Sequence, residues 1–133
     1  MAPFGHEKKD AENAKLHAEL ERISALGLQQ LAVEVMTKGF GPGGPAEQQP
    51  EGLGTIAGAF NPAEGFFGID DDALVMMAVV VAEGLQVLEH ACLVREVFSG
   101  GDVASLDYTA TRFGRAALAE PDGVEKVLSG GSL

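Results

Sequence analysis

The stretch Glu83–Leu118, EGLQVLEHACLVREVFSGGDVASLDYTATRFGRAAL, shows most about the architecture, because the spacing of its apolar residues changes within it. Its first residues continue a helix that begins further upstream. Leu93–Phe98 and Ala104–Thr109 then favour two strands, and the turn Ser99–Asp102 between them predicts a β-hairpin. The alternative is that the helix continues through Phe98, because several residues here also fit a helical spacing.

The upstream helix is predicted over Asp71–Ala91. Asp70, Asp71 and Asp72 precede or open it, and acidic residues at a helix N-terminus cap the free N–H groups. Binding of a cation is the alternative role for these three carboxylates. The first half of the helix is apolar all round, which predicts a central position in the core, and the second half has one polar stripe, formed by Glu83, Gln86 and His90.

The rest of the chain predicts shorter helices around this unit. Residues 10–26 and 28–38 have helical spacing on either side of Gly27, so they form two helices or one kinked helix. Residues 39–54 predict a mobile Gly/Pro-rich loop, followed by a short helix near 55–60. Two more helices are expected near 111–119 and 121–128. The expected organisation is an N-terminal helical extension (1–27), a domain (28–128) and a flexible tail (129–133).

Two short motifs resemble the second half of a bacterial winged helix-turn-helix domain. The first is the turn LEHACLV, in which Cys92 stands where that family commonly has glycine. The second is the closing pattern Tyr108, Thr111, Gly114, Arg115 and Leu118. The resemblance implies a mainly α fold with a small β-hairpin, a winged-helix-like domain preceded by an N-terminal helix. It also implies a transcriptional regulator that places its third helix in the DNA major groove.

The charge of the chain argues against that activity. The formal net charge is −11 and the sequence pI is about 4.5, so the chain repels polyphosphate at long range. The predicted third helix and its cap (residues 70–91) contain no lysine or arginine but five carboxylates. Contact with nucleic acid would depend on Arg95, Arg112 and Arg115, joined in a dimer by Lys8, Lys9 and Lys15.

The sequence contains no complete pattern for catalysis or for a cofactor. Gly39, Gly41 and Gly44 match G-x-G-x-x-G, but they follow a helix and prolines interrupt them, which favours a flexible linker over a dinucleotide site. His90 with its neighbouring carboxylates favours a solvated helix face over a metal site. Cys92, between Glu89 and Glu96, favours a small buried side chain over a nucleophile. We therefore expect no cofactor, no metal and no enzymatic activity.

The compartment expected for the chain is the cytoplasm. Cys92 is the single cysteine, so no intrachain disulfide can form. The first residues lack the apolar core of a signal peptide, and the longest apolar run, Ala73–Ala82, has ten residues. A membrane span needs about 20, so this run predicts a buried helix and no membrane partner.

The remaining expectation concerns partners. Leu16, Leu20 and Ile23 form a short apolar stripe, which packs either on its own domain or on a second copy or partner. Phe66 and Phe67 need cover and would mark an interface if exposed. The sequence thus favours a non-enzymatic, acidic interaction or regulatory module that binds a protein partner or forms a homodimer. The alternative is a winged-helix DNA-binding regulator that acts as a dimer.

Overall fold

The structure is a computed structural model that describes residues 3–64, 68–99 and 105–131. It confirms the expected class, mainly α with a small β-hairpin. The elements, in chain order, are α1 (Pro3–Ser24), α2 (Leu28–Val35), a π-helical turn (Met36–Phe40), β1 (Glu51–Gly52), α3 (Leu53–Gly58), α4 (Asp71–His90), β2 (Val94–Ser99), β3 (Ser105–Ala110), α5 (Arg112–Ala119) and α6 (Gly123–Leu128).

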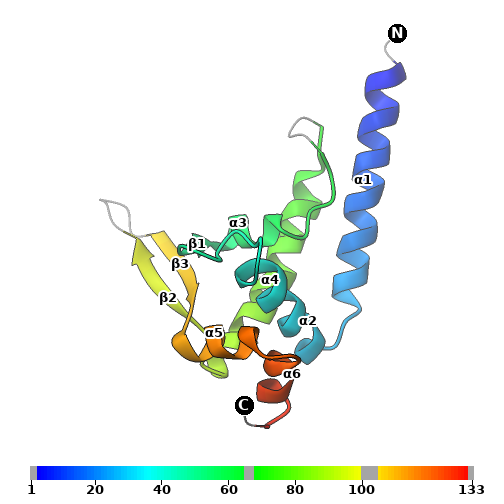
Figure 1. Ribbon diagram of the computed structural model, residues 1–133. Coiled ribbons are helices and arrows are strands. Elements are labelled where there is room, and N and C mark those ends of the chain that lie inside the picture. Colours follow the sequence, from blue (N-terminus) through cyan, green and yellow to red (C-terminus); the bar gives the residue numbers. More distant parts are fainter. Residues whose placement is uncertain (1–2, 65–67, 100–104, 132–133) are drawn as a thin grey trace.

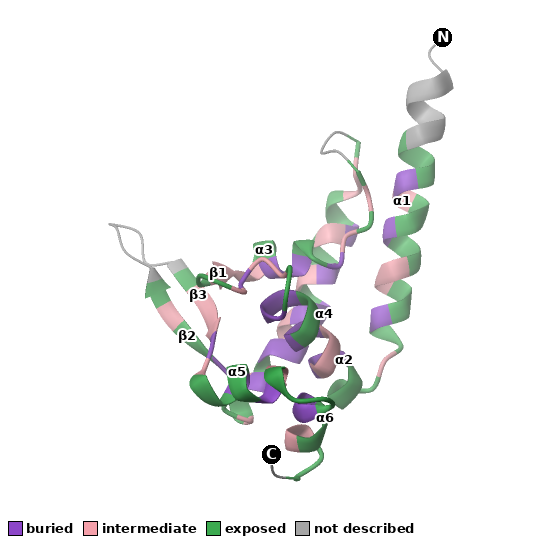
Figure 2. Cartoon of the chain, viewed as in Figure 1, coloured by how far each residue is buried: buried purple, intermediate pink, exposed green. Residues whose placement is uncertain are grey.

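Helix α4 is the centre of packing. Helices α1, α2 and α3 and strand β2 all contact it, and Figure 1 shows α1 and the β2–β3 hairpin on opposite sides of it. Helix α2 packs closely on α4 at Gly84, where a Cβ would lie 2.8 Å from a methyl group of Val35. Buried residues gather where these helices face one another (Figure 2).

The hairpin is confirmed, and continuation of the helix through Phe98 is wrong. Strands β2 and β3 pair antiparallel from Val94 opposite Ala110 to Ser99 opposite Ser105. The residues of the tip, 100–104, lie outside the described residues. β1 pairs with the outer side of β3, which gives a three-stranded sheet of order β1-β3-β2. This strand has two residues and lies within the Gly/Pro-rich segment 39–54, so it is too short to show the alternation of side chains that predicts a strand.

Helix α4 ends because the chain turns into the left-handed region at Cys92, where φ is +62°. The Leu93 N–H donates to the Leu88 carbonyl at 2.9 Å, and the Cys92 N–H donates to the Glu89 carbonyl at 3.0 Å. These two bonds, together with the buried side chains of Leu88 and Leu93, form a Schellman motif. Its left-handed position is usually glycine, which gives a physical reason for the glycine common at this point of the LEHACLV-like turn.

The segment between α2 and α3 differs from the expected loop. The helical path does not end at Lys38 but continues as the π-helical turn to Phe40, which is buried. Gly41 then packs against this turn so closely that a Cβ there would overlap the Thr37 carbonyl oxygen. Close backbone packing therefore accounts for the glycine at position 41, and within residues 3–64 no strand precedes the segment as a dinucleotide site would require.

Candidate interaction surface

The most distinctive surface of the described residues is the exposed face of α4. Its opposite face is buried, through Ala73, Met77, Val80, Val81, Gly84, Leu85 and Leu88. On the exposed face lie Val75, Met76 and Val79, whose exposed fractions are 61%, 50% and 47%. We call these three residues the α4 stripe. The first half of the helix is thus central to the packing, as expected, but one of its apolar faces is left uncovered by the described residues.

Carboxylates bound the α4 stripe at both ends. Asp71 and Asp72 lie one turn before Val75, and Glu83 lies one turn after Val79; all three are exposed. Helix α4 contains no lysine or arginine. The surface is thus apolar in its middle and negative at its ends, and Gln86 and His90 extend it toward the C-terminus.

The N-terminus of α4 is fixed by Asp70, as its capping role predicts. The Asp70 Oδ1 accepts from the N–H groups of Asp72 at 3.0 Å and Ala73 at 3.3 Å, and its Oδ2 lies 2.9 Å from the His17 Nε2 on α1. The Ala73 N–H and the His17 ring lower the pKa of the Asp70 carboxyl. Asn13 of α1 adds two bonds: it accepts from the Asp70 N–H and donates to the Gly68 carbonyl. The start of the α4 stripe is therefore held rigidly against α1.

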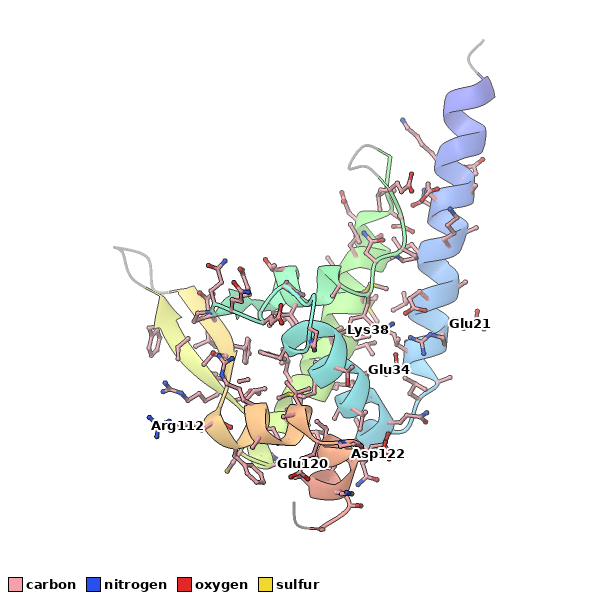
Figure 3. All side chains as sticks on the ribbon, in the orientation of Figure 1. Glu21, Glu34, Lys38, Arg112, Glu120 and Asp122 are labelled. Carbon is pink, nitrogen blue, oxygen red and sulfur yellow. The ribbon has the colours of Figure 1, made fainter. Side chains whose placement is uncertain are left out.

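Helix α1 is joined to α2 by ion pairs. Arg22 donates to the carboxylates of Glu19 and Glu34 over distances of 2.7 to 2.8 Å. The Arg22 guanidinium lowers the pKa of both carboxyls, and both carboxyls raise the pKa of Arg22. Lys38 completes the group and lies 4.9 Å from the centre of the Phe60 ring. Figure 3 shows Glu34 and Lys38 where α2 faces α1.

Two of the residues expected to meet a partner are buried inside the chain instead. Leu16 and Ile23 are 0% exposed and belong to the hydrophobic core of the described residues, and Leu20 packs against it. Their helix face is covered by α4, so of the two alternatives left open by the sequence the structure has packing on the chain's own domain, and Leu16 and Ile23 are not available as an interface. Phe66 and Phe67 lie outside the described residues.

The candidate nucleic-acid residues are exposed but separated from the basic residues of α1. Arg95 lies on β2, and Arg112 and Arg115 lie on α5, where Arg112 points away from the molecule (Figure 3). Arg115 donates to the Glu47 carbonyl at 3.3 Å. Lys9 and Lys15 are on α1, on the other side of α4 (Figure 1), and Lys15 pairs with Glu12. The side chain of Lys8 lies outside the described residues.

The C-terminal end of α4 brings two carboxyl groups together. Burial and the neighbouring Glu96 raise the pKa of Glu89, whose side chain also hydrogen-bonds with Glu96. Tyr108 lies opposite Glu96 on β3, and its pKa is raised by burial and by the two carboxylates. Besides the acidic ends of the α4 stripe, a further pair of neighbouring carboxyl groups, Glu89 and Glu96, thus lies where α4 meets the hairpin.

The other candidates of the sequence are not assembled into a site. Cys92 is exposed, so its expected burial is wrong. Within the described residues no group of three or more His, Cys, Asp or Glu side chains is placed to hold a metal ion. Glu83, Gln86 and His90 project into solvent from α4.

Hollows of the described surface are open to solvent, and both polar and apolar atoms line them. One of about 450 Å³ lies between α2 and α6, with Glu120 and Asp122 close by at the α5–α6 junction (Figure 3). Its lining residues are Gln29, Gln30, Val33, Asp122, Glu125, Lys126 and Ser129. No convergent set of catalytic groups points into it. Besides the α4 stripe, the cross-strand pair Phe98 and Leu106 is apolar and exposed, by 78% and 41%. This pair adjoins residues 100–104, which lie outside the described part, so we do not treat it as a candidate surface.

The exposed α4 stripe had a signal in the sequence. The polar positions Glu83, Gln86 and His90 define one helix face, and steps of three or four residues toward the N-terminus reach Val79, Val75 and Asp72. Within Ala73–Ala82 every residue is apolar, so the sequence of this run does not show which helix face is exposed. Which of these apolar residues are covered depends on where the neighbouring helices and strands pack on α4.

Comparison of the chain with protein-family models, with curated proteins and with solved structures finds no match. In the described part of the chain, α4 is the one helix whose length and apolar composition would suffice to cross a membrane. This is a weak indication, because the core helix of a soluble protein passes the same test.

Proposed function

We propose that this chain is a non-enzymatic protein-interaction module, and that the α4 stripe is the surface through which it binds a protein partner. The observation that carries the proposal is the exposure of Val75, Met76 and Val79 on one face of the central helix. Three adjacent exposed apolar side chains on a rigid helix favour association, because their burial removes apolar surface from water at about 25 cal/mol per Å².

The rigidity of α4 supports the same proposal. Its opposite face is locked by α1, α2 and α3, and its N-terminus is capped by Asp70 and tied to Asn13 and His17. A surface that is already ordered loses little conformational entropy when it binds. The partner therefore meets a preformed helix face.

A winged-helix DNA-binding regulator is the second candidate. From α2 to β3 the elements run helix, strand, helix, helix and hairpin, which supports the resemblance seen in the sequence. Its third helix would be α4, whose exposed face has Asp71, Asp72 and Glu83 and no cation. Because the phosphate backbone supplies much of the affinity for DNA, this charge makes protein the favoured partner.

A matched pair of variants tests the interaction module. The double variant M76Q/V79T replaces two residues of the α4 stripe by polar residues of similar size, whereas L28Q does so at an apolar residue of α2 that is 57% exposed. A protein captured by wild type is purified, and its affinity for the three forms is measured. We expect binding to wild type and L28Q and a loss of at least about tenfold with M76Q/V79T.

Fluorescence anisotropy with labelled DNA fragments separates the two candidates. We expect no binding at low salt. Binding that weakens steeply as salt is added, and that is lost when Arg95 and Arg112 are replaced by glutamine, would favour the DNA regulator instead.

A further inference from the structure

The charges around the α4 stripe define the kind of partner that fits it. This inference rests on the proposed function, because it assumes that the α4 stripe is a binding surface. Asp72 and Glu83 lie on the exposed face about three helical turns apart, roughly 17 Å, and Val75, Met76 and Val79 lie between them. A partner must cover the apolar centre and meet negative charge at both ends.

A second copy of this chain fits poorly. An antiparallel pair of α4 helices that places Val75 against Val79 of the second copy also places Asp71 opposite Glu83 of that copy. A parallel pair places each carboxylate opposite itself. Both arrangements bring like charges together at the edge of an apolar contact, and the net charge of −11 on each chain adds repulsion.

A helix of opposite charge fits both features. Helices pack side by side when apolar residues recur every three or four positions on the contact face. Lysine or arginine about three turns apart on such a helix would lie opposite the two acidic ends of the α4 stripe. We propose that the α4 stripe binds an amphipathic helix of a protein partner whose apolar face is flanked at both ends by basic residues.

Two designed peptides of about 18 residues test this inference with the full chain. Both are helical with leucine at positions spaced by three and four; one has lysines flanking the leucines three turns apart, and the other has glutamates there. Binding is measured by anisotropy for wild type, M76Q/V79T and the control L28Q. Circular dichroism of each variant checks that the fold is intact.

The expected result has three parts. Wild type and L28Q bind the basic peptide at least about tenfold more tightly than the acidic peptide. M76Q/V79T lowers affinity for the basic peptide at least about tenfold, which attraction to the net charge alone would not produce. The variant D72N/E83Q binds more weakly and with a smaller dependence on salt, because it removes the charges at the ends.

Three results would overturn the inference. The first is equal binding of the basic peptide to M76Q/V79T and wild type, which means attraction to charge alone. The second is a dimer of the wild type in light scattering that M76Q/V79T dissociates, which assigns the surface to a second copy. The third is flotation of the wild type, but not of M76Q/V79T, with phosphatidylcholine vesicles, which assigns it to lipid.

The proposed function can stand when the inference fails. If the captured protein depends on the α4 stripe but docks an acidic or uncharged surface there, the interaction module is retained and the basic helix is rejected. If no protein depends on the α4 stripe and neither peptide binds, both proposals fall.

Discussion

The two ends of α4 are stabilised in different ways. At the N-terminus, the Asp70 side chain caps the helix, and Asp71 and Asp72 lie at the positive end of its dipole, where carboxylates are favoured. At the C-terminus, Glu89 lies at the negative end beside Glu96, and a non-glycine residue, Cys92, occupies the left-handed position. One end follows the local rules of helix formation, and the other departs from them. The C-terminal end must therefore be held by contacts with the rest of the fold.

The largest effect should come from the packing that holds this C-terminal end. Leu88 and Leu93 are the buried apolar residues of the Schellman motif, and both are 0% exposed. Leu88→Ala should lower the free energy of unfolding by about 3 kcal/mol, because it leaves a cavity in the core. Urea unfolding gives the value. The matched change on the opposite face, Val79→Thr, should stay within about 0.5 kcal/mol. Equal losses would mean that the two faces of α4 are not distinct.

The next effect concerns the hydrogen bonds that anchor the turn after α4. The Thr111 hydroxyl donates to the Cys92 carbonyl at 2.7 Å and accepts from the Gly114 N–H at 2.9 Å, so it joins the turn to the start of α5. Thr111→Ala should cost about 1.5 kcal/mol, because it removes a helix cap and leaves a carbonyl with one bond fewer. Thr111→Ser keeps the hydroxyl and should retain most of the stability in thermal unfolding. A loss as large in the serine variant would point to the methyl group instead.

Features that depend on neighbouring residues in the chain could be predicted from the sequence. The Asp70 cap, the hairpin and the α5 start near Thr111 follow from residue types at fixed short spacings. The class of the fold follows from them.

Features that depend on which elements meet could not be predicted. Whether Leu16 or Val75 is covered depends on where α1 packs on α4, and both are equally apolar in the sequence. β1 exists only because β3 offers an open edge to two residues of a Gly/Pro-rich segment. The position of Cys92 at the helix end, between Glu89 and Glu96, predicts a small buried side chain, but Cys92 takes the left-handed position of the turn and is exposed.

The next prediction concerns the left-handed residue after α4. Cys92→Gly would place at this position the residue type that adopts a positive φ without steric strain. An L residue in the left-handed region costs about 1 to 2 kcal/mol, and part of the gain from glycine is lost to the greater freedom of the unfolded chain. Cys92→Gly should therefore stabilise the fold by about 0.5 to 1 kcal/mol, since the exposed side chain loses no burial. Cys92→Ala keeps the backbone strain and should give no gain. Thermal melts of both in reducing buffer test this, and equal stability of the two variants would show that the strain is not relieved.

The smallest effect concerns how the free energy of unfolding depends on pH. The carboxylates at the two ends of α4, Asp70 and Glu89, should contribute to it with opposite sign. Burial and Glu96 raise the pKa of Glu89 above its ordinary value of 4.5. Its contribution to stability is therefore fully present below that value and lost as the pH rises through the folded-state pKa. Glu89→Gln, which resembles the protonated acid, should be more stable than wild type at pH 7, by no more than about 0.5 kcal/mol because the group is partly exposed. The difference should vanish below pH 4.5.

Asp70 should show the opposite sign in the same urea titrations. Its pKa is lowered from 3.8 by the Ala73 N–H, so its contribution is present above that value and lost as the pH falls through the folded-state pKa. Asp70→Asn should therefore be less stable than wild type at pH 7, and the difference should shrink in acid. If both variants shifted stability in the same direction with pH, the carboxylates at the two ends of α4 would be electrostatically alike. The contrast between a capped N-terminus and a strained C-terminus would then have to be attributed to Cys92 and to packing alone.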